Sequence, residues 1–198
     1  MDHGMTLVQQ IADYSAKLRY EEISSEAVNR AKEILFDSIG TALGAYRNPL
    51  ALKASRYAVE QMPGHQATVM GSGLHSSVEG AAFANATMIK ILGMDESHRS
   101  ASHIAAQVVP AALAVGEDTG ASGQELIRAM VAAYDLAVRL GRTVRKAQRK
   151  RGLDVKGTVG SIAAALAAGL VAGLDVGQLS HAISLAADMS SGTEQYVY

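Results

Sequence analysis

The sequence has no cysteine and no tryptophan, and only three prolines and two phenylalanines among its 198 residues. Without cysteine the chain cannot form a disulfide framework, hold a thiolate-ligated zinc or iron–sulfur site, or use a thiol nucleophile. The formal net charge of −1 excludes a globally basic nucleic-acid-binding protein, although it still permits a local basic patch.

The sequence also lacks a long apolar run. The longest one covers 13 residues, 162–174, whereas a helix that spans a bilayer needs about 20. The first ten residues lack the basic and apolar regions of a secretory signal peptide. We therefore expect a cytoplasmic protein that does not bind membranes.

Alanine and glycine are abundant, with 35 and 19 residues. Apolar residues recur at spacings of three and four, which is typical of amphipathic helices, and only residues 67–70 have strand character. The predicted fold class is therefore all-α, with one domain over residues 1–198 in which small side chains let the helices approach closely. The predicted helices are 5–18, 25–44, 49–61, 78–92, 103–116, 124–141, 157–173 and 176–189.

A polar segment between two apolar helices, residues 93–102, has the sequence GMDESHRSAS and is followed by His103. Histidine titrates near neutral pH, and a neighbouring carboxylate can orient it or share in proton transfer. The alternative is a solvated loop in which Ser102 caps the next helix. No metal site is predicted, because His98 and His103 are five residues apart and no further ligands are defined.

Seven of the 18 lysines and arginines fall within residues 139–151. Arginine can bind carboxylates or phosphates through paired hydrogen bonds. Cations at a helix end are, however, also a common solvated arrangement, and the pattern favours this second interpretation. No aromatic residue is interleaved, so nucleic-acid binding is not expected. We interpret residues 142–156 as a basic connector, followed by a glycine-containing turn whose amides at 157–159 are candidates for binding an anion.

Seven segments have an order and spacing typical of one known family. They are 25–32 (SEAVNRAK), 35–40 (LFDSIG), 67–71 (ATVMG), 81–85 (AAFAN), 108–114 (VVPAALA), 122–126 (SGQEL) and 151–160 (RGLDVKGTVG). Together they resemble the MmgE/PrpD family, which includes 2-methylcitrate dehydratase, cis-aconitate decarboxylase and iminodisuccinate epimerase.

The resemblance implies an all-helical first domain that forms a homodimer and an α/β lid domain built from later sequence. It also implies an active site that needs no cofactor and accepts a small di- or tricarboxylate. The shared chemistry is proton transfer at a carbon next to a carboxylate, coupled to dehydration, decarboxylation or epimerisation. We therefore expect a lyase or isomerase whose lid, or a partner chain that replaces it, lies outside these 198 residues.

Carried over residue by residue, the resemblance assigns catalytic roles to Asp95 and His103, which match positions in the family's loop "HxLDFDDTH…HPS". The sequence departs from the family at Lys90, where the leading His stands, and at Gly93, where the first Asp stands. A third departure is Asp154, in place of the His of "RGFH". The residues expected to line or tune the substrate pocket are Lys90, His98, Asp154, Lys156 and Arg151.

These departures exchange charges rather than removing them, which favours an altered specificity over a loss of chemistry. Lys90 is expected either to pair with Asp95 or to bind a substrate carboxylate. The alternative is a non-catalytic helical module or subunit that needs a partner chain. The absence of the family's Asp and His and of a lid motivates this second hypothesis.

Overall fold

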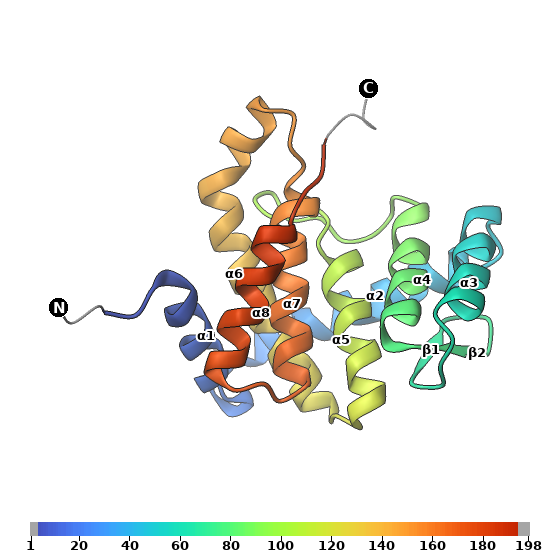
Figure 1. Ribbon diagram of the computed structural model, residues 1–198, viewed down its shortest axis with the longest axis horizontal. Helices are drawn as coiled ribbons and strands as arrows, with labels where there is room; N and C mark the ends of the chain where they lie inside the picture. Colours follow the sequence, from blue (N-terminus) through green and yellow to red (C-terminus); the bar gives the residue numbers. More distant parts are fainter. Residues whose placement is uncertain (1–3, 194–198) are drawn as a thin grey trace.

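A computed structural model describes residues 4–193 of the protein (Figure 1). Over these residues the chain is all-α, as predicted, with one small antiparallel hairpin. Among them the α-helices are α1 (Leu7–Lys17), α2 (Ser25–Ala45), α3 (Pro49–Gln61), α4 (Val78–Ile91), α5 (Ala105–Thr119), α6 (Gly123–Lys150), α7 (Ser161–Val171) and α8 (Val176–Met189). A short 3₁₀ turn, η1, covers Tyr20–Glu22, and a single π-helical turn, η2, covers Lys156–Gly160 directly before α7.

Polar side chains determine where most of these helices begin. Each accepts a hydrogen bond from a backbone amide of the first helical turn, which would otherwise lack a partner. The capping residues are Thr6, Ser24, Asn48, Ser77, Ser122 and Asp175. Two predicted caps are thereby confirmed: Ser24, one of two serines proposed to start α2, and Asp175 before α8.

The hairpin pairs β1 (Ala67–Val69) with β2 (Leu74–Ser76). The strand expected at residues 67–70 is confirmed, whereas β2 was not predicted. Between the strands Gly71 and Gly73 have φ of 72° and 68°, a left-handed conformation that only glycine adopts readily. The predicted turn at residues 71–73 is therefore present.

The predicted basic connector at residues 142–156 is wrong, because α6 continues through Lys150. Arginine, lysine, glutamine and alanine are strong helix formers, and Val144 also packs against the core. The last buried residue of α6 is Gly141, and the remaining turns extend beyond the helices packed around them (Figure 1).

The core lies where α4, α5 and α7 pack side by side, with α3 against α4, and α6 and α8 against α7. Most of its buried apolar residues are alanines; the largest fully buried side chains include Met88, Ile89, Ile104, Met130 and Leu166. Small side chains thus allow the close helix packing that the composition predicts. Within residues 4–193 no helix combines the length and apolar character needed to cross a membrane.

Candidate active site

Asp95 is the centre of a polar cluster in the loop that joins α4 to α5. Its carboxylate has no exposed surface, and its Oδ1 lies 2.9 Å from Lys90 Nζ and 3.5 Å from His103 Nδ1. A buried charge is expensive unless it is paired, and the Lys90 ammonium group supplies such a partner to the Asp95 carboxylate. The structure therefore brings together three of the residues predicted from the sequence: Asp95, His103 and Lys90.

The backbone of Asp95 also orients the imidazole of His103. His103 Nδ1 lies 3.1 Å from the Asp95 carbonyl oxygen, which can only accept a hydrogen bond. In the neutral ring, Nδ1 therefore carries the proton and Nε2 has a free lone pair. This is the tautomer that a general base acting through Nε2 requires.

The loop between Asp95 and His103 is held in shape by its own hydrogen bonds. The amide of His98 donates to the Ser102 carbonyl at 3.0 Å, and the amide of Ser102 donates back at 2.7 Å. The amide of Ser100 donates to His98 Nδ1 at 3.1 Å. Ser102 has φ of 64°, which is unfavourable for a residue with a Cβ. His98 thus stabilises the loop through Nδ1, while its predicted role towards substrate stays a prediction.

Glu96, rather than Ser102, caps α5. Glu96 Oε2 accepts a hydrogen bond from the amide of Ala105 at 3.1 Å, and no side chain caps the helix from its N-cap residue, Ile104. The alternative in which Ser102 caps this helix is therefore wrong. Sequence reasoning missed this role, because Glu96 and Ala105 are nine residues apart and no local capping pattern connects them.

The environment of Glu96 is unusual for a carboxyl group. Burial raises its pKa from 4.5 to about 7, against the opposing effects of the Ala105 amide and of Tyr134. Burial, together with Glu96, also raises the pKa of Tyr134, so the phenol keeps its proton. Asp95 Oδ2, Glu96 Oε1 and the Tyr134 hydroxyl are all buried without a hydrogen bond of acceptable geometry from the described residues. Glu96 and Tyr134 therefore form a buried polar cluster close to Asp95, in which burial favours the protonated form of each group.

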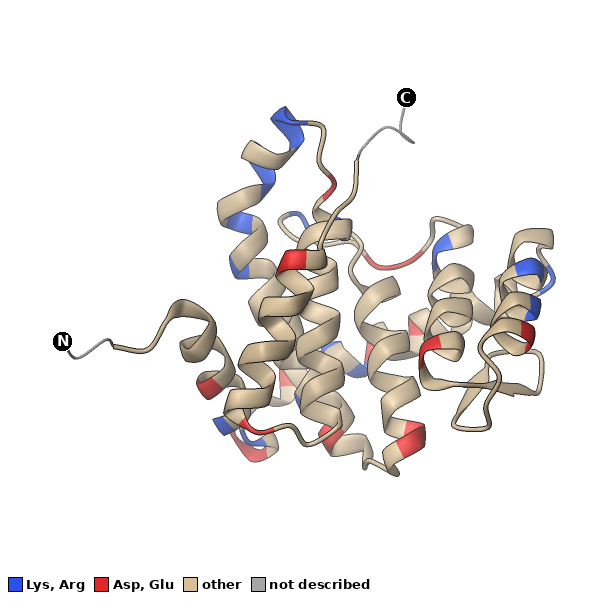
Figure 2. Cartoon of the chain, in the orientation of Figure 1, with Lys and Arg blue, Asp and Glu red and all other residues tan. Residues whose placement is uncertain are grey.

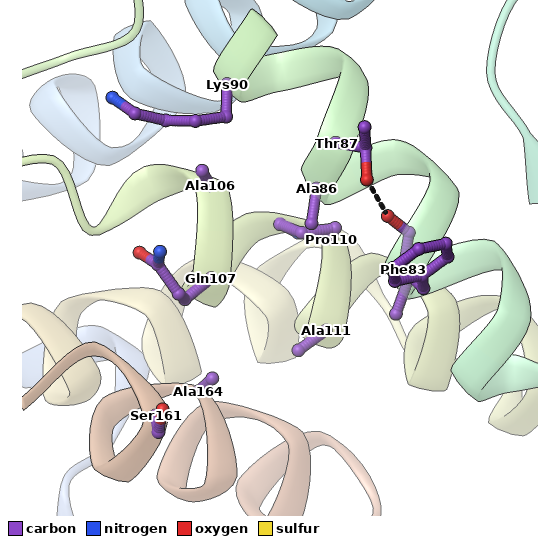
Figure 3. Close-up of a pocket in the computed structure, with 11 residues that line it drawn as sticks. Phe83, Ala86, Thr87, Lys90, Ala106, Gln107, Pro110, Ala111, Ser161 and Ala164 are labelled. Carbon is purple, nitrogen blue, oxygen red and sulfur yellow. Dashed lines mark hydrogen bonds between the residues drawn. The ribbon is translucent and has the colours of Figure 1, made fainter. Parts of the chain in front are cut away.

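A cavity of about 450 Å³ opens beside Lys90, between α4, α5 and the start of α7 (Figure 3). The polar residues that line it include Lys90, Gln107 and Ser161; Phe83, Pro110 and several alanines make up most of the apolar lining. His103 does not line this cavity, but Asp95 connects it to Lys90, which does. We call this space the Lys90 cavity.

Gln107 lines the Lys90 cavity and also packs against the π turn η2. The Gln107 amide is assigned the orientation in which its nitrogen faces two backbone carbonyls. In this orientation the nitrogen donates to the carbonyls of His103 and Ile104, at 3.0 and 3.2 Å. A side chain at Gly160, in η2, would meet the Gln107 side chain at 3.2 Å, so the π turn packs directly against it. π-helical turns occur frequently at functional sites.

Asp154 and Lys156, at the start of this π turn, form a second polar cluster. Lys156 Nζ lies 3.3 Å from Asp154 Oδ2, and the Lys156 amide donates to Asp154 Oδ1 at 3.0 Å. The predicted anion site at amides 157–159 is thus next to a carboxylate of the chain itself, which already occupies the amide of Lys156. Arg151 is exposed at the C-terminal end of α6 and does not line the Lys90 cavity. Its predicted role stays a prediction, as do those of Asp154 and Lys156.

Comparison with known proteins identifies the family. Residues 9–198 match the model of the MmgE/PrpD N-terminal domain. The chain belongs to the MmgE/PrpD family. The resemblance that the sequence motifs indicated is therefore confirmed.

Curated relatives of this MmgE/PrpD domain include decarboxylases. It is 24% identical over 192 residues to the cis-aconitate decarboxylase-like protein oryM of Aspergillus oryzae, which covers 92% of this chain and 40% of that protein. It is 25% identical over 144 residues to cis-aconitate decarboxylase of Aspergillus terreus, covering 70% of this chain and 29% of that enzyme. The chain thus spans less than half the length of these relatives.

One departure from the MmgE/PrpD motif has a backbone explanation. Gly93, at the position of the motif's first Asp, has φ of 62° and follows the end of α4. This left-handed conformation is costly for a residue with a Cβ. Lys90, at the position of the motif's His, instead supplies a cation to the remaining Asp95. Within residues 4–193 no group of three or more histidine or acidic side chains is placed to hold a metal ion.

Proposed function

We propose that this chain forms the helical part of a lyase or isomerase that acts on a small di- or tricarboxylate. The proposed chemistry is proton transfer at a carbon next to a carboxylate. The observation that carries the proposal is the contact of one buried carboxylate, Asp95, with both an imidazole and an ammonium group. Membership of the MmgE/PrpD family and the decarboxylase relatives support the same reaction class.

His103 is the proposed base. Its Nε2 removes a proton from the carbon next to a substrate carboxylate, and the electron pair of the broken C–H bond moves into that carboxylate. The imidazolium that results is stabilised by Asp95 Oδ1, at 3.5 Å from the other ring nitrogen. In an epimerisation the carbon then takes up a proton from water on its opposite face, and His103 releases the first proton to solvent; in a dehydration the proton leaves with hydroxide as water.

In a decarboxylation the direction of the first step changes. Carbon dioxide leaves, its bonding electrons remain on the carbon, and an imidazolium at His103 supplies the proton that this carbon takes up. In each case Lys90 is the proposed partner of a substrate carboxylate. It lines the Lys90 cavity, and its ammonium group, 2.9 Å from Asp95 Oδ1, would attract negative charge that develops on a substrate bound there. Exclusion of water by a lid would strengthen this attraction.

The test uses the complete product of the gene, incubated in D₂O with cis-aconitate, citrate and 2-methylcitrate. NMR follows deuterium incorporation next to the carboxylates, which reports proton transfer whichever product forms. We expect exchange or turnover of at least one acid, a loss of about 10²–10⁴-fold in His103→Ala, and a raised KM in Lys90→Ala. His181→Ala, at an exposed position on α8, is the matched control.

The result that would overturn the proposal is equally specific. If no acid is exchanged or turned over, and His103→Ala binds these acids as weakly as the unmodified protein, the site is not a proton-transfer site. The non-catalytic helical module that requires a partner chain would then be the better description.

A further inference from the structure

A second cavity, of about 560 Å³, lies between the loop at residues 98–102 and the C-terminal half of α6. It shares no lining residue with the Lys90 cavity. Besides Ser100 and Gly141, its lining consists of Arg99, Arg142, Arg145, Lys146, Arg149 and Lys150. Figure 2 shows how lysine and arginine gather along this half of the helix. We call this cavity the basic groove.

Most of the cations in the basic groove have no acidic partner among residues 4–193. One turn earlier on α6, Arg139 Nε lies 2.9 Å from both carboxylate oxygens of Asp135. Residues 142–151 contain no acid at all. The described residues provide no ion-pair partner for Arg99, Arg142, Arg145, Lys146 or Lys150. Like charges three and four residues apart on a helix repel one another, so an external anion would relieve this repulsion.

The opposite wall of the groove depends on Gly141. A Cβ at this position would clash with the carbonyl oxygen of Ser100. Glycine is disfavoured in the middle of a helix, but here it lets the loop lie directly against α6. The loop is closed by the two backbone hydrogen bonds between His98 and Ser102. Arg99, which lies in this loop, therefore lines the same groove as the cations of α6. The groove is thus formed by two elements that the fold holds together.

The dimensions of the groove indicate the kind of anion. Arg142 and Lys150 are eight residues apart, so the cations extend for about 12 Å along the helix. A single phosphate or carboxylate would reach the side chains of one turn only. Guanidinium groups bind phosphate oxygens in pairs, and a chain of phosphates presents such oxygens along its whole length. We propose that the basic groove binds a small molecule that carries a chain of phosphates.

The lining also argues against nucleic acid as the ligand. It contains no aromatic side chain on which a base could stack. The phosphate chain is therefore the part of the ligand that the groove recognises. Because Arg99 lies on the loop and the other cations lie on α6, the bound anion bridges the two elements and restrains the loop.

Isothermal titration calorimetry at about 0.15 M salt tests the site with inorganic tripolyphosphate, orthophosphate, citrate and a single-stranded oligonucleotide as separate probes. We expect tripolyphosphate to bind at least about tenfold more tightly than orthophosphate or citrate. Arg142→Gln/Arg145→Gln should lose about tenfold or more in affinity. The control is Lys53→Gln/Arg56→Gln, which removes two exposed cations at the same spacing on α3 and should bind tripolyphosphate like the unmodified protein. Hydrogen exchange should show slower exchange of amides 98–102 on binding.

Four results would overturn the proposal. Equal affinities for tripolyphosphate and orthophosphate, or equal losses in the two double variants, would show non-specific attraction by charge. Tighter binding of the oligonucleotide than of tripolyphosphate would make the groove a nucleic-acid surface. Binding without slower exchange at 98–102 would contradict the bridging arrangement. None of these readouts depends on catalytic activity, so they are independent of the proposed function.

Discussion

At the scale of single residues, Asp95 has two roles that its side chain and its backbone divide between them. The carbonyl fixes the tautomer of His103, and the carboxylate pairs with Lys90 and is proposed to stabilise the imidazole when it becomes charged. Asp95→Asn keeps the carbonyl and removes only the charge. We therefore expect kcat for the reacting acid to fall about 10²-fold while the His103 tautomer is retained, which NMR of the imidazole nitrogens can verify.

The control for this variant is Asp37→Asn, an exposed acid on α2. It should leave kcat unchanged. An Asp95→Asn protein with undiminished kcat would show that the carboxylate does not support the charged imidazole during the reaction.

A second residue-scale prediction concerns Gly141, which permits the contact between the loop and α6. In Gly141→Ala the new methyl group would clash with the backbone of Ser100. Overpacking of this kind costs about 1–3 kcal/mol, and urea denaturation should show that loss. At Gly40, in the interior of α2, nothing lies within 4 Å of a new Cβ.

Gly40→Ala is therefore the matched control, and it should stabilise the protein by about 0.5–1 kcal/mol. The expected result is that the free energy of unfolding falls in Gly141→Ala and rises in Gly40→Ala. A Gly141→Ala protein as stable as Gly40→Ala would mean that the loop does not need to lie so close to the helix.

The residues that sequence alone could identify are those whose partners are close in the chain or match a motif. Asp95 and His103 belong to one dense polar segment, and Lys90 follows from its charge and its place in the motif. Glu96 could be seen as an acid but not as a helix cap, and Tyr134 showed no signal at all. The roles of Glu96 and Tyr134 depend on how deeply each side chain is buried. That burial results from the packing of α6 against the loop, which is a tertiary contact.

At the scale of elements, Glu96, which caps α5, makes the stability of the protein depend on pH. Its pKa is raised from 4.5 to about 7 in the folded protein. Below pH 4.5 the Glu96 carboxyl is protonated in both the folded and the unfolded chain, so it does not lower the free energy of unfolding. As pH rises from 4.5 to 7 the unfolded chain releases the proton more readily, so the protein loses stability, by about 3 kcal/mol in all.

Glu96→Gln should abolish this loss, since an amide does not ionise and its oxygen can still accept from Ala105. The stability of the variant relative to the unmodified protein should therefore increase between pH 5 and pH 8, as measured by urea denaturation. Glu60→Gln, at an exposed position on α3, should show no such increase. A difference between Glu96→Gln and the unmodified protein that does not vary with pH would mean that the buried carboxyl titrates normally.

Elements were predictable wherever a cap or an apolar period defined them, as for α2 and α8. The end of α6, residues 142–150, was missed because it contains a single larger apolar residue, Val144, which is too few to show a helical period. The second strand, Leu74–Ser76, was missed because three residues after a glycine turn are too few to show alternation. Its position follows from pairing with β1, which is a tertiary contact.

At the scale of the whole molecule, a core made largely of alanine leaves several larger apolar side chains outside. Phe36 and Leu43, seven residues apart on α2, are 81% and 46% exposed. Residues at this spacing lie on one face of a helix. Burial of such a face against a second copy would add apolar contact area that the alanine core supplies sparingly. We therefore predict that the protein is a homodimer that uses this face of α2.

Sedimentation equilibrium at micromolar protein concentrations tests this prediction. Phe36→Ser/Leu43→Ser should weaken the dimer at least about tenfold, because each buried apolar side chain of this size contributes about 1.5–3 kcal/mol. The control is Leu185→Ser/Met189→Ser on α8, where the two side chains are 63% and 80% exposed. If the control variant dissociates and the α2 variant does not, α8 is the interface. If the unmodified protein is a monomer throughout, exposed apolar side chains on this domain are not evidence of self-association, and the α2 face has to be covered by a different chain or domain.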